Sequence, residues 1–124
     1  ILLSRSFQKP QTVADSALKT KLSKLRLEML SRPGDKWTVE DMAENVSLSP
    51  SRFHVVYKAL FRITPIRDLI NARVDYAKVL LLENREETLA VIAEKLGYKN
   101  PYDFCRQFTR VTGISPGTYR KNNR

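Results

Sequence analysis

One sequence unit occurs twice in this chain, and the repeat limits the possible folds more than any other feature. Residues 38–65 correspond to residues 88–116. Matched residues lie 50 positions apart at Ala43 and Ala93, and 51 positions apart from Pro50 and Pro101 onwards. The second copy therefore has one additional residue in its turn. The matched residues are Ala43 with Ala93, and Pro50, Phe53, Tyr57 and Pro65 with Pro101, Phe104, Phe108 and Pro116. With 124 residues, the chain is expected to form one domain, or two small ones that share a core.

Each copy begins with a short segment whose apolar residues follow the spacing i, i+3, i+4 and i+7. This spacing predicts an amphipathic helix, because it places all four residues on one face. Thr38 and Thr88 precede these segments and are suited to cap the helix N-termini, and Gly97 is suited to end the second helix in the left-handed conformation. The apolar residues are Val39, Met42, Ala43 and Val46 in the first copy and Leu89, Ile92, Ala93 and Leu96 in the second.

A second helix is predicted in each copy, after a brief turn. Ser49-Pro50 and Asn100-Pro101 both combine a capping side chain with a proline suited to the first helical position. The residues expected to face inward are Phe53, Val56, Tyr57 and Leu60 in the first copy and Phe104, Phe108 and Val111 in the second. Two short helices across a tight turn form a helix-turn-helix, whose second helix can enter the major groove of DNA. The sequence therefore predicts two such units, at about residues 38–61 and 88–112.

The segments outside the two copies are predicted to be helical as well. One amphipathic helix is expected at about residues 16–31, a linker helix at about 65–83, and a last short helix after Ser115-Pro116. Residues 1–15 are interpreted as a linker remnant or a disordered lead-in, and residues 122–124 as a tail. The apolar stripe of the linker helix consists of Ile66, Leu69, Ile70, Ala77, Leu80 and Leu81. The expected fold is all-α, with about seven helices forming two helix-turn-helix subdomains joined by the linker helix.

Residues of the second copy and of the linker helix carry a resemblance to a known family. They are Ile92-Ala93, Leu96-Gly97-Tyr98, Phe104, Phe108, Gly113-Ile114-Ser115-Pro116 and Tyr119-Arg120, with Arg73, Ala77 and Leu80-Leu81 between the copies. Over roughly residues 18–121, and within a domain expected at 16–121, the chain resembles the DNA-binding domain of the AraC/XylS family of bacterial transcription regulators. The resemblance implies a separate sensing or dimerising domain in the full protein, and RNA polymerase as a partner of the full regulator.

The charge of the chain favours nucleic acid or another anionic surface as its partner. The formal net charge is +9. Residues 89–124 hold seven lysines and arginines against two acids, whereas residues 65–88 hold four against five. A basic tail that only aids solubility is the less favoured explanation, because several of these charges recur at helical spacing.

Several other classes of function find no support in the sequence. No apolar run approaches the ~20 residues that a membrane-spanning helix requires. One cysteine excludes an internal disulfide and fits a reducing cytoplasm, and one histidine with one cysteine cannot form a zinc site with the usual number of ligands. Glycine is too sparse for a phosphate-binding loop, and no cluster of catalytic residues is visible. We therefore expect no cofactor, no metal, no membrane association and no enzymatic activity.

The outward faces of the two second helices supply the candidate DNA-binding residues. A helix in the major groove reads bases near its N-terminus and contacts phosphates at its flanks. The residues expected to read bases are Ser51, His54 and Val55 in the first unit and Tyr102, Asp103 and Arg106 in the second. The residues expected at the DNA backbone are Lys58, Lys99 and Arg110, together with the capping residues Thr38, Ser49, Thr88 and Asn100, whose helix N-termini present free amides.

Simpler roles remain open for several of these residues. His54 can be a neutral surface histidine, and Val55 can contact a thymine methyl group or nothing. Asp103 repels phosphate, so it either accepts a hydrogen bond from cytosine or holds Arg106 in position. Tyr102 can stack on the sugar-phosphate backbone instead of reading a base.

The sequence thus predicts sequence-specific binding of double-stranded DNA by the output domain of a cytoplasmic transcription regulator, with its two recognition helices in adjacent major grooves. The alternative is a protein-interaction module whose basic helices bind an acidic partner, and a third possibility is nonspecific nucleoid packaging. We expect this chain to be monomeric, with dimerisation of the full-length protein through another domain.

Overall fold

The computed structural model describes residues 13–123, which form seven α-helices and no β-strand. The predicted all-α class is therefore confirmed. The lead-in expected at residues 1–15 lies mostly outside the described residues, and the first helix begins at Val13, before the expected position 16. The helices are α1 (Val13–Ser31), α2 (Val39–Asn45), α3 (Pro50–Phe61), α4 (Pro65–Glu83), α5 (Leu89–Lys95), α6 (Pro101–Thr112) and α7 (Pro116–Asn122).

Capping side chains define where the helices from α2 onwards begin. Each of the six has a serine, threonine or asparagine at its N-cap, whose side-chain oxygen accepts a hydrogen bond from the amide three residues later. Such a cap stabilises a helix by about 1 kcal/mol. A proline follows the cap in α3, α4, α6 and α7, where its missing N–H removes no helical hydrogen bond. The six caps are Thr38, Ser49, Thr64, Thr88, Asn100 and Ser115.

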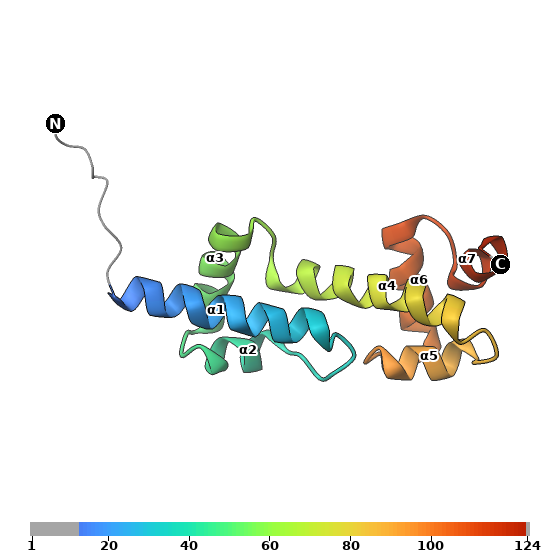
Figure 1. Ribbon diagram of the computed structural model, residues 1–124, viewed down its shortest axis with the longest axis horizontal. Helices are drawn as coiled ribbons and strands as arrows, with labels where there is room; N and C mark the ends of the chain where they lie inside the picture. The colour runs from blue at the N-terminus through green and yellow to red at the C-terminus, as the bar shows by residue number, and fades with distance from the viewer. Residues whose placement is uncertain (1–12, 124) are drawn as a thin grey trace, which may run out of the picture.

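Two groups of helices lie at the two ends of α4 (Figure 1), and each group encloses a hydrophobic core with part of α4. The first core is formed by α1, α2, α3 and the N-terminal half of α4, and its last buried residue is Ala72. The second core begins at Val74 and includes α5, α6 and the C-terminal half of α4. Aromatic pairs occupy equivalent places, Phe53 with Tyr57 in the first core and Phe104 with Phe108 in the second. The linker helix is thus a structural part of both helix-turn-helix units.

Two apolar residues that were expected to face a core are exposed instead. Val111 is 37% exposed, because the chain leaves α6 at Gly113 and Tyr119 of α7 covers Phe108 with its ring centroid 5.7 Å away. Ile66 is 47% exposed, because it stands in the first turn of α4, where the helix face that carries the core residue Leu69 three positions later has not yet reached the core. Helical spacing identified the correct faces of both helices, but not the points at which those faces leave the core.

The two copies end their helices with different residues in the left-handed conformation. Ser47 has a φ of 60° and Arg62 a φ of 63°, whereas the matching positions of the second copy are Gly97 and Gly113, with φ values of 85° and 88°. Glycine adopts this conformation at little cost, whereas other residues are destabilised in it. The first copy therefore contains more backbone strain than the second.

Two arginines connect the end of α4 with α7. The Arg120 guanidinium donates hydrogen bonds to the carbonyl oxygens of Leu81, Asn84 and Glu87, at 3.0, 3.1 and 3.0 Å. Arg85, just after α4, donates in turn to the carbonyls of Arg120 and Asn123. The bond to Leu81 satisfies one of the carbonyl groups that the C-terminus of α4 leaves without a helical partner. Residue 120 therefore closes the C-terminal end of α4.

Candidate nucleic-acid interface

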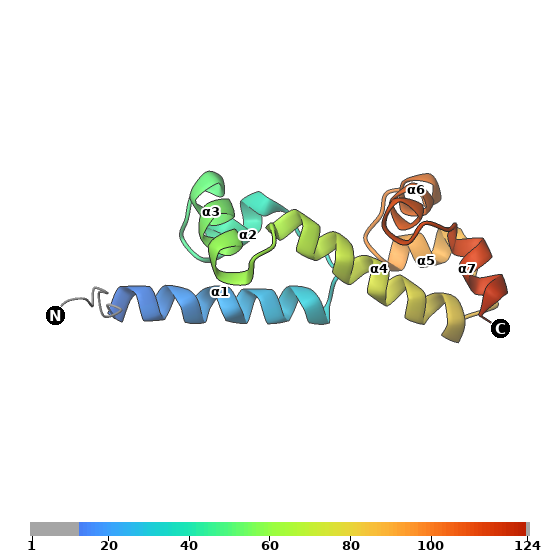
Figure 2. The same ribbon diagram turned by 90° about the horizontal axis from the view of Figure 1, so that it is seen from above.

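The second helices of the two units, α3 and α6, lie along the same edge of the molecule at opposite ends (Figure 2). Both cross its long axis (Figure 1). Each packs against the preceding helix of its unit and against α4. This arrangement allows both helices to present their outward faces to one extended partner.

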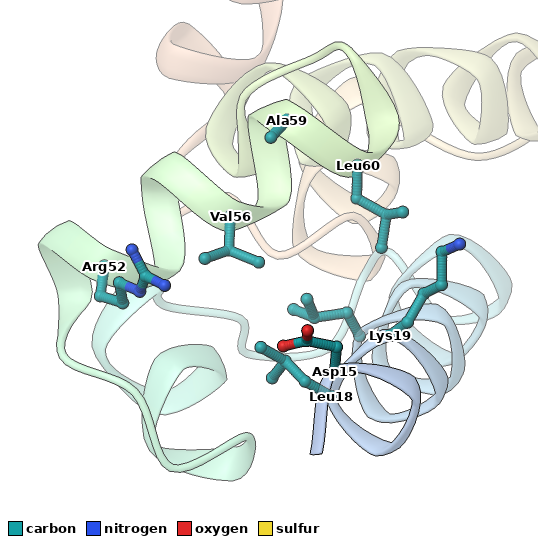
Figure 3. A pocket seen from close by; sticks show the side chains of 8 residues that line it. Asp15, Leu18, Lys19, Arg52, Val56, Ala59 and Leu60 are labelled. Atoms are coloured by element: carbon teal, nitrogen blue, oxygen red, sulfur yellow. The ribbon is translucent and has the colours of Figure 1, made fainter. Parts of the chain in front are cut away.

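The inward and outward faces of α3 carry different residues, except that Ala59 lies at the border of both. Its inward face contributes Val56 and Leu60 to a groove of about 400 Å³ between α3 and α1, opposite Leu18 (Figure 3). Leu22 of α1 also lines this groove. None of the residues expected to contact DNA lines this groove. Ser51, His54, Val55 and Lys58 are all exposed, and Val55 is exposed by 58% of its surface although it is apolar.

A shallow depression on the outward side of α3 brings three of the predicted residues together. His54, Val55 and Lys58 line it, and Ser51 lies outside it. Arg62, which was not predicted, completes this surface at the helix C-terminus. The spacing of four residues from His54 to Lys58 and on to Arg62 is the signal that would have identified it. Because α3 contains no acidic residue, the depression is positively charged.

A buried ionic network holds α3 against the rest of the first unit. Asp68 of α4 is only 4% exposed and accepts hydrogen bonds from Arg26 of α1, at 2.6 and 3.3 Å, and from the Tyr57 hydroxyl of α3. The Arg26 guanidinium also lies 4.9 Å from the ring centroid of Phe61. The hydrogen bond to Asp68 raises the pKa of Arg26, and burial followed by the same carboxylate raises the pKa of Tyr57. Asp68 thereby ties three helices to one another.

On α6, the structure brings Tyr102, Arg106 and Arg110 together around a second shallow depression. Tyr102 is 67% exposed, and the Arg106 guanidinium carbon lies 5.4 Å from its ring centroid. Thr109, which was not predicted, lines the same surface three residues after Arg106. Its hydroxyl donates to the Cys105 carbonyl at 2.7 Å, so this proton is already used within α6.

The suggestion that Asp103 holds Arg106 in position finds no support in the contacts of Asp103. Asp103 is half-buried, its amide donates to the Asn100 side-chain oxygen at 2.9 Å, and its carboxylate accepts from the Asn100 amide nitrogen at 3.3 Å. The salt bridges found within residues 13–123 do not include a pair between Asp103 and Arg106. Asp103 belongs to the N-terminal cap of α6, and the neighbour of Arg106 is the Tyr102 ring.

The residues expected at the DNA backbone fall into two groups. Lys58, Lys99 and Arg110 are exposed, with Lys58 and Arg110 in the last turns of α3 and α6. The remaining four are the N-caps Thr38, Ser49, Thr88 and Asn100, whose side-chain oxygens are engaged within their own helices. They leave backbone amides as the groups available to a phosphate.

The first turns of α2 and α5 differ in charge. The first turn of α2 carries Glu40 and Asp41, whereas the first turn of α5 carries no acidic residue. Carboxylates beside helix amides reduce their attraction for another anion, since they already complement the positive end of the helix dipole. The N-terminus of α5 therefore offers the more favourable environment for a phosphate.

Other kinds of site are not found in the described part of the chain. Between residues 13 and 123, no cluster of histidine, cysteine, aspartate and glutamate is arranged to hold a metal ion. No helix in that range combines the length and the apolar character needed to cross a membrane. Cys105 is half-buried against the second core, and burial raises the pKa of its thiol.

The chain has two helix-turn-helix units that share a linker helix, and both units expose a basic second helix on the same side. This arrangement defines the class of a helix-turn-helix transcription regulator. A family model described as a helix-turn-helix domain matches residues 42–122. With this match and the relatives below, the chain belongs to the AraC/XylS family of transcription regulators, as its sequence predicted.

Individual relatives agree with this assignment. A Streptomyces lividans protein described as an AraC-like transcription regulator is 34% identical over 110 residues, which is 89% of this chain and 34% of that protein. The DNA-binding domain of AdpA, solved with a target DNA, has a TM-score of 0.75 and 26% identity over 82% of this chain and 91% of its own. The C-terminal domain of AraT, a response regulator from Geobacillus stearothermophilus, has a TM-score of 0.76 and 28% identity over 82% and 84%. The chain spans 24–34% of the length of four curated relatives.

Proposed function

We propose that this chain binds double-stranded DNA in a sequence-specific manner as the output domain of a bacterial transcription regulator. The observation that carries this proposal is the placement of α3 and α6 along one edge, each with an exposed basic face. The similarity to the AdpA domain, whose structure contains a target DNA, supports it. In this arrangement α3 and α6 enter adjacent major grooves of one duplex, as expected for helix-turn-helix recognition.

The two helices read different bases, because their outward faces differ in chemistry. Ser51, His54 and Val55 read the groove occupied by α3, with the Val55 side chain placed against a thymine methyl group. In α6, Tyr102 and Arg106 face the bases, and the guanidinium of Arg106 donates two parallel hydrogen bonds to guanine. Asp103 contributes less than the sequence suggested, because its carboxylate is engaged with Asn100. The resulting site consists of two unlike half-sites and does not require a palindrome.

Contacts to the DNA backbone position these helices. Lys58 and Arg110 approach phosphates at the ends of α3 and α6, with Arg62 as an additional contact, and Lys99 approaches from the turn before α6. Amides beside Thr88 bind a phosphate more strongly than those beside Thr38, because the first turn of α2 carries two acids. The amides of Ser51 and Tyr102, which follow Pro50 and Pro101 at the starts of α3 and α6, supply the remaining contacts to the backbone.

The wider role follows from the family. The full regulator acts in the cytoplasm, contacts RNA polymerase and dimerises through another domain. This chain binds DNA as a monomer. No catalytic activity is proposed, because the family and the fold are those of transcription regulators.

Selection of binding sites from a random duplex library tests the proposal. We expect a monomer of this chain to enrich two adjacent, unlike half-sites and to protect both of their major grooves in footprinting. If about five phosphates are neutralised, log affinity should fall with log salt with a slope of about −4 to −5. Equal binding of all sequences would favour nonspecific packaging, and a slope near zero would favour an acidic protein partner. Protection of a symmetric site only by a dimer of this chain would contradict the monomeric arrangement.

A further inference from the structure

Arg73 connects the two helix-turn-helix units through contacts that are separate from the backbone of α4. It stands between Ala72, the last residue of the first core, and Val74, the first residue of the second. Its side chain donates from Nε to the Pro33 carbonyl at 2.8 Å and from Nη2 to the Asp35 carbonyl at 3.2 Å. Arg73 therefore binds the loop between α1 and α2, which belongs to the first unit.

The same guanidinium also contacts the second unit. Its Cζ atom lies 5.7 Å from the ring centroid of Tyr98, in the turn between α5 and α6. The Tyr98 ring packs on Phe104 at 5.5 Å between centroids, and its hydroxyl donates to the side-chain oxygen of Gln107. Phe104 and Gln107 both belong to α6. A continuous series of contacts thus runs from the first unit through Arg73 to the second recognition helix.

The backbones of the two units touch at the same place. A Cβ atom on Gly34 would lie 2.0 Å from the carbonyl oxygen of Lys95, the last residue of α5. A Cβ atom on Gly97 would lie 2.9 Å from Arg73 Nη2 and 2.9 Å from the Gly34 carbonyl oxygen. Because real Cβ atoms do not approach other atoms this closely, both positions need glycine for contact. We call this contact the latch: Arg73, Gly34, Gly97 and Tyr98.

A single helix between two units leaves them free to twist and bend about that helix by small amounts. A second attachment beside the helix removes most of this freedom, because the units are then joined at two points. We propose that Arg73 is a positioning residue for DNA recognition, which sets the distance and the relative rotation of α3 and α6 through the latch. The protein then accepts one spacing between its half-sites. This inference rests on the proposed function, because spacing matters only if both helices bind one duplex.

The latch is first tested without DNA, so that this result does not depend on DNA binding. Spin labels are attached through Ala59→Cys in α3 and Thr109→Cys in α6, both exposed positions, in a Cys105→Ala background. Pulsed electron–electron double resonance then measures the distribution of label distances. Arg73→Met keeps an unbranched apolar stem of similar length but removes the hydrogen-bond donors of the guanidinium. This variant should broaden the distribution of label distances or shift it. Arg67→Met, on the exposed side of the same helix, is the matched control and should leave it unchanged.

The second measurement uses DNA. The selected site is compared with versions in which one base pair is added or removed between the half-sites, which changes both their distance and their rotation. The parent chain and Arg67→Met should lose at least about tenfold in affinity on the altered spacings, because simultaneous engagement of both helices is impaired. Arg73→Met should lose less than about threefold on the same change, with weaker binding to the original spacing.

The outcomes separate the latch from the proposed function. If the parent chain shows no sequence preference, the proposed function fails, while the label distances still decide whether Arg73 joins the units. The inference would be overturned if Arg73→Met showed the same distribution of label distances and the same spacing preference as the parent chain. If Arg73→Met does not fold, Arg73→Lys takes its place, because one ammonium group cannot reproduce both carbonyl bonds and the contact with Tyr98. The same broadening and the same loss of spacing preference are then expected.

Discussion

Replacing Arg106 by alanine tests whether α6 reads a base. The guanidinium is exposed and has the Tyr102 ring at 5.4 Å as its neighbour, with no salt bridge to Asp103. Its removal should therefore change the free energy of unfolding by no more than about 0.5–1 kcal/mol, the usual size of an exposed cation–π contact. A change in DNA affinity can then be attributed to the lost contact with DNA.

The expected loss of affinity follows from the kind of contact. A bidentate pair of arginine with guanine discriminates against other bases by about 1–3 kcal/mol. At about 1.4 kcal/mol per tenfold, this corresponds to about 5- to 140-fold weaker binding of Arg106→Ala to the preferred site. On a site in which the contacted guanine is replaced, the parent and the variant should bind with nearly equal affinity.

The assay measures dissociation constants for both proteins on a set of single-base variants of the selected site, at one salt concentration. Arg110→Ala, one turn further along α6, is the control for a phosphate contact. It should weaken binding to every variant by a similar factor and reduce the magnitude of the salt slope by about one. An equal loss on every variant for Arg106→Ala would refute the base-reading role and leave Arg106 as a phosphate contact.

Three further predictions concern DNA shape and stability. The 19 residues of α4 span about 28 Å at ~1.5 Å per residue, which is less than the ~34 Å between successive major grooves. The DNA should therefore bend when both recognition helices bind it. Straight DNA in a circular-permutation gel, with both grooves protected, would contradict this prediction. Asp68→Ala should lower the free energy of unfolding by about 3 kcal/mol. This value is near the lower end of the range for a broken buried ion pair, because the Arg26 side chain is 33% exposed. A loss below about 1 kcal/mol in urea unfolding would show that the network contributes little. Ser47→Gly should stabilise the folded chain by about 0.5 kcal/mol, because glycine relieves the strain of the left-handed backbone conformation. Gly97→Ser should destabilise it by more than about 1 kcal/mol for the opposite reason. If thermal unfolding shows no change for either variant, the strain argument is contradicted.

Local features of the fold were predictable because they depend on neighbouring residues. Thr88, Asn100 and Pro101 mark helix starts by hydrogen bonds and dihedral restrictions that extend over three or four residues. The recurrence of the whole unit then predicted two similar packing arrangements. Exposed residues of α3 and α6 could be proposed for the same reason, since helical spacing assigns a face to each residue.

Features that join distant segments were not predictable in this way. The pairing of Arg26 with Asp68 connects residues 42 positions apart, and that of Arg73 with Pro33 connects residues 40 positions apart. Periodicity says which face a residue occupies but not which segment covers it, so Arg73 was noticed only as part of a family resemblance. The same reason accounts for Val111, whose exposure depends on the path of the chain after α6.

The contact of Arg120 with the end of α4 has a consequence for the order in which the chain assembles during translation. The buried residues of the first core all precede residue 73, so this core can close while the rest of the polypeptide is still being synthesised. The Leu81 carbonyl in the last turn of α4 obtains its bond from Arg120 only when residue 120 has left the ribosome exit tunnel. We therefore expect nascent chains stalled soon after residue 100 emerges to carry a protease-resistant N-terminal unit beside an unfinished second one, and equal protease sensitivity of both would contradict this order. Two similar copies of one sequence unit thus fold in a fixed order during translation, and the second copy completes its structure only after its final residues are synthesised.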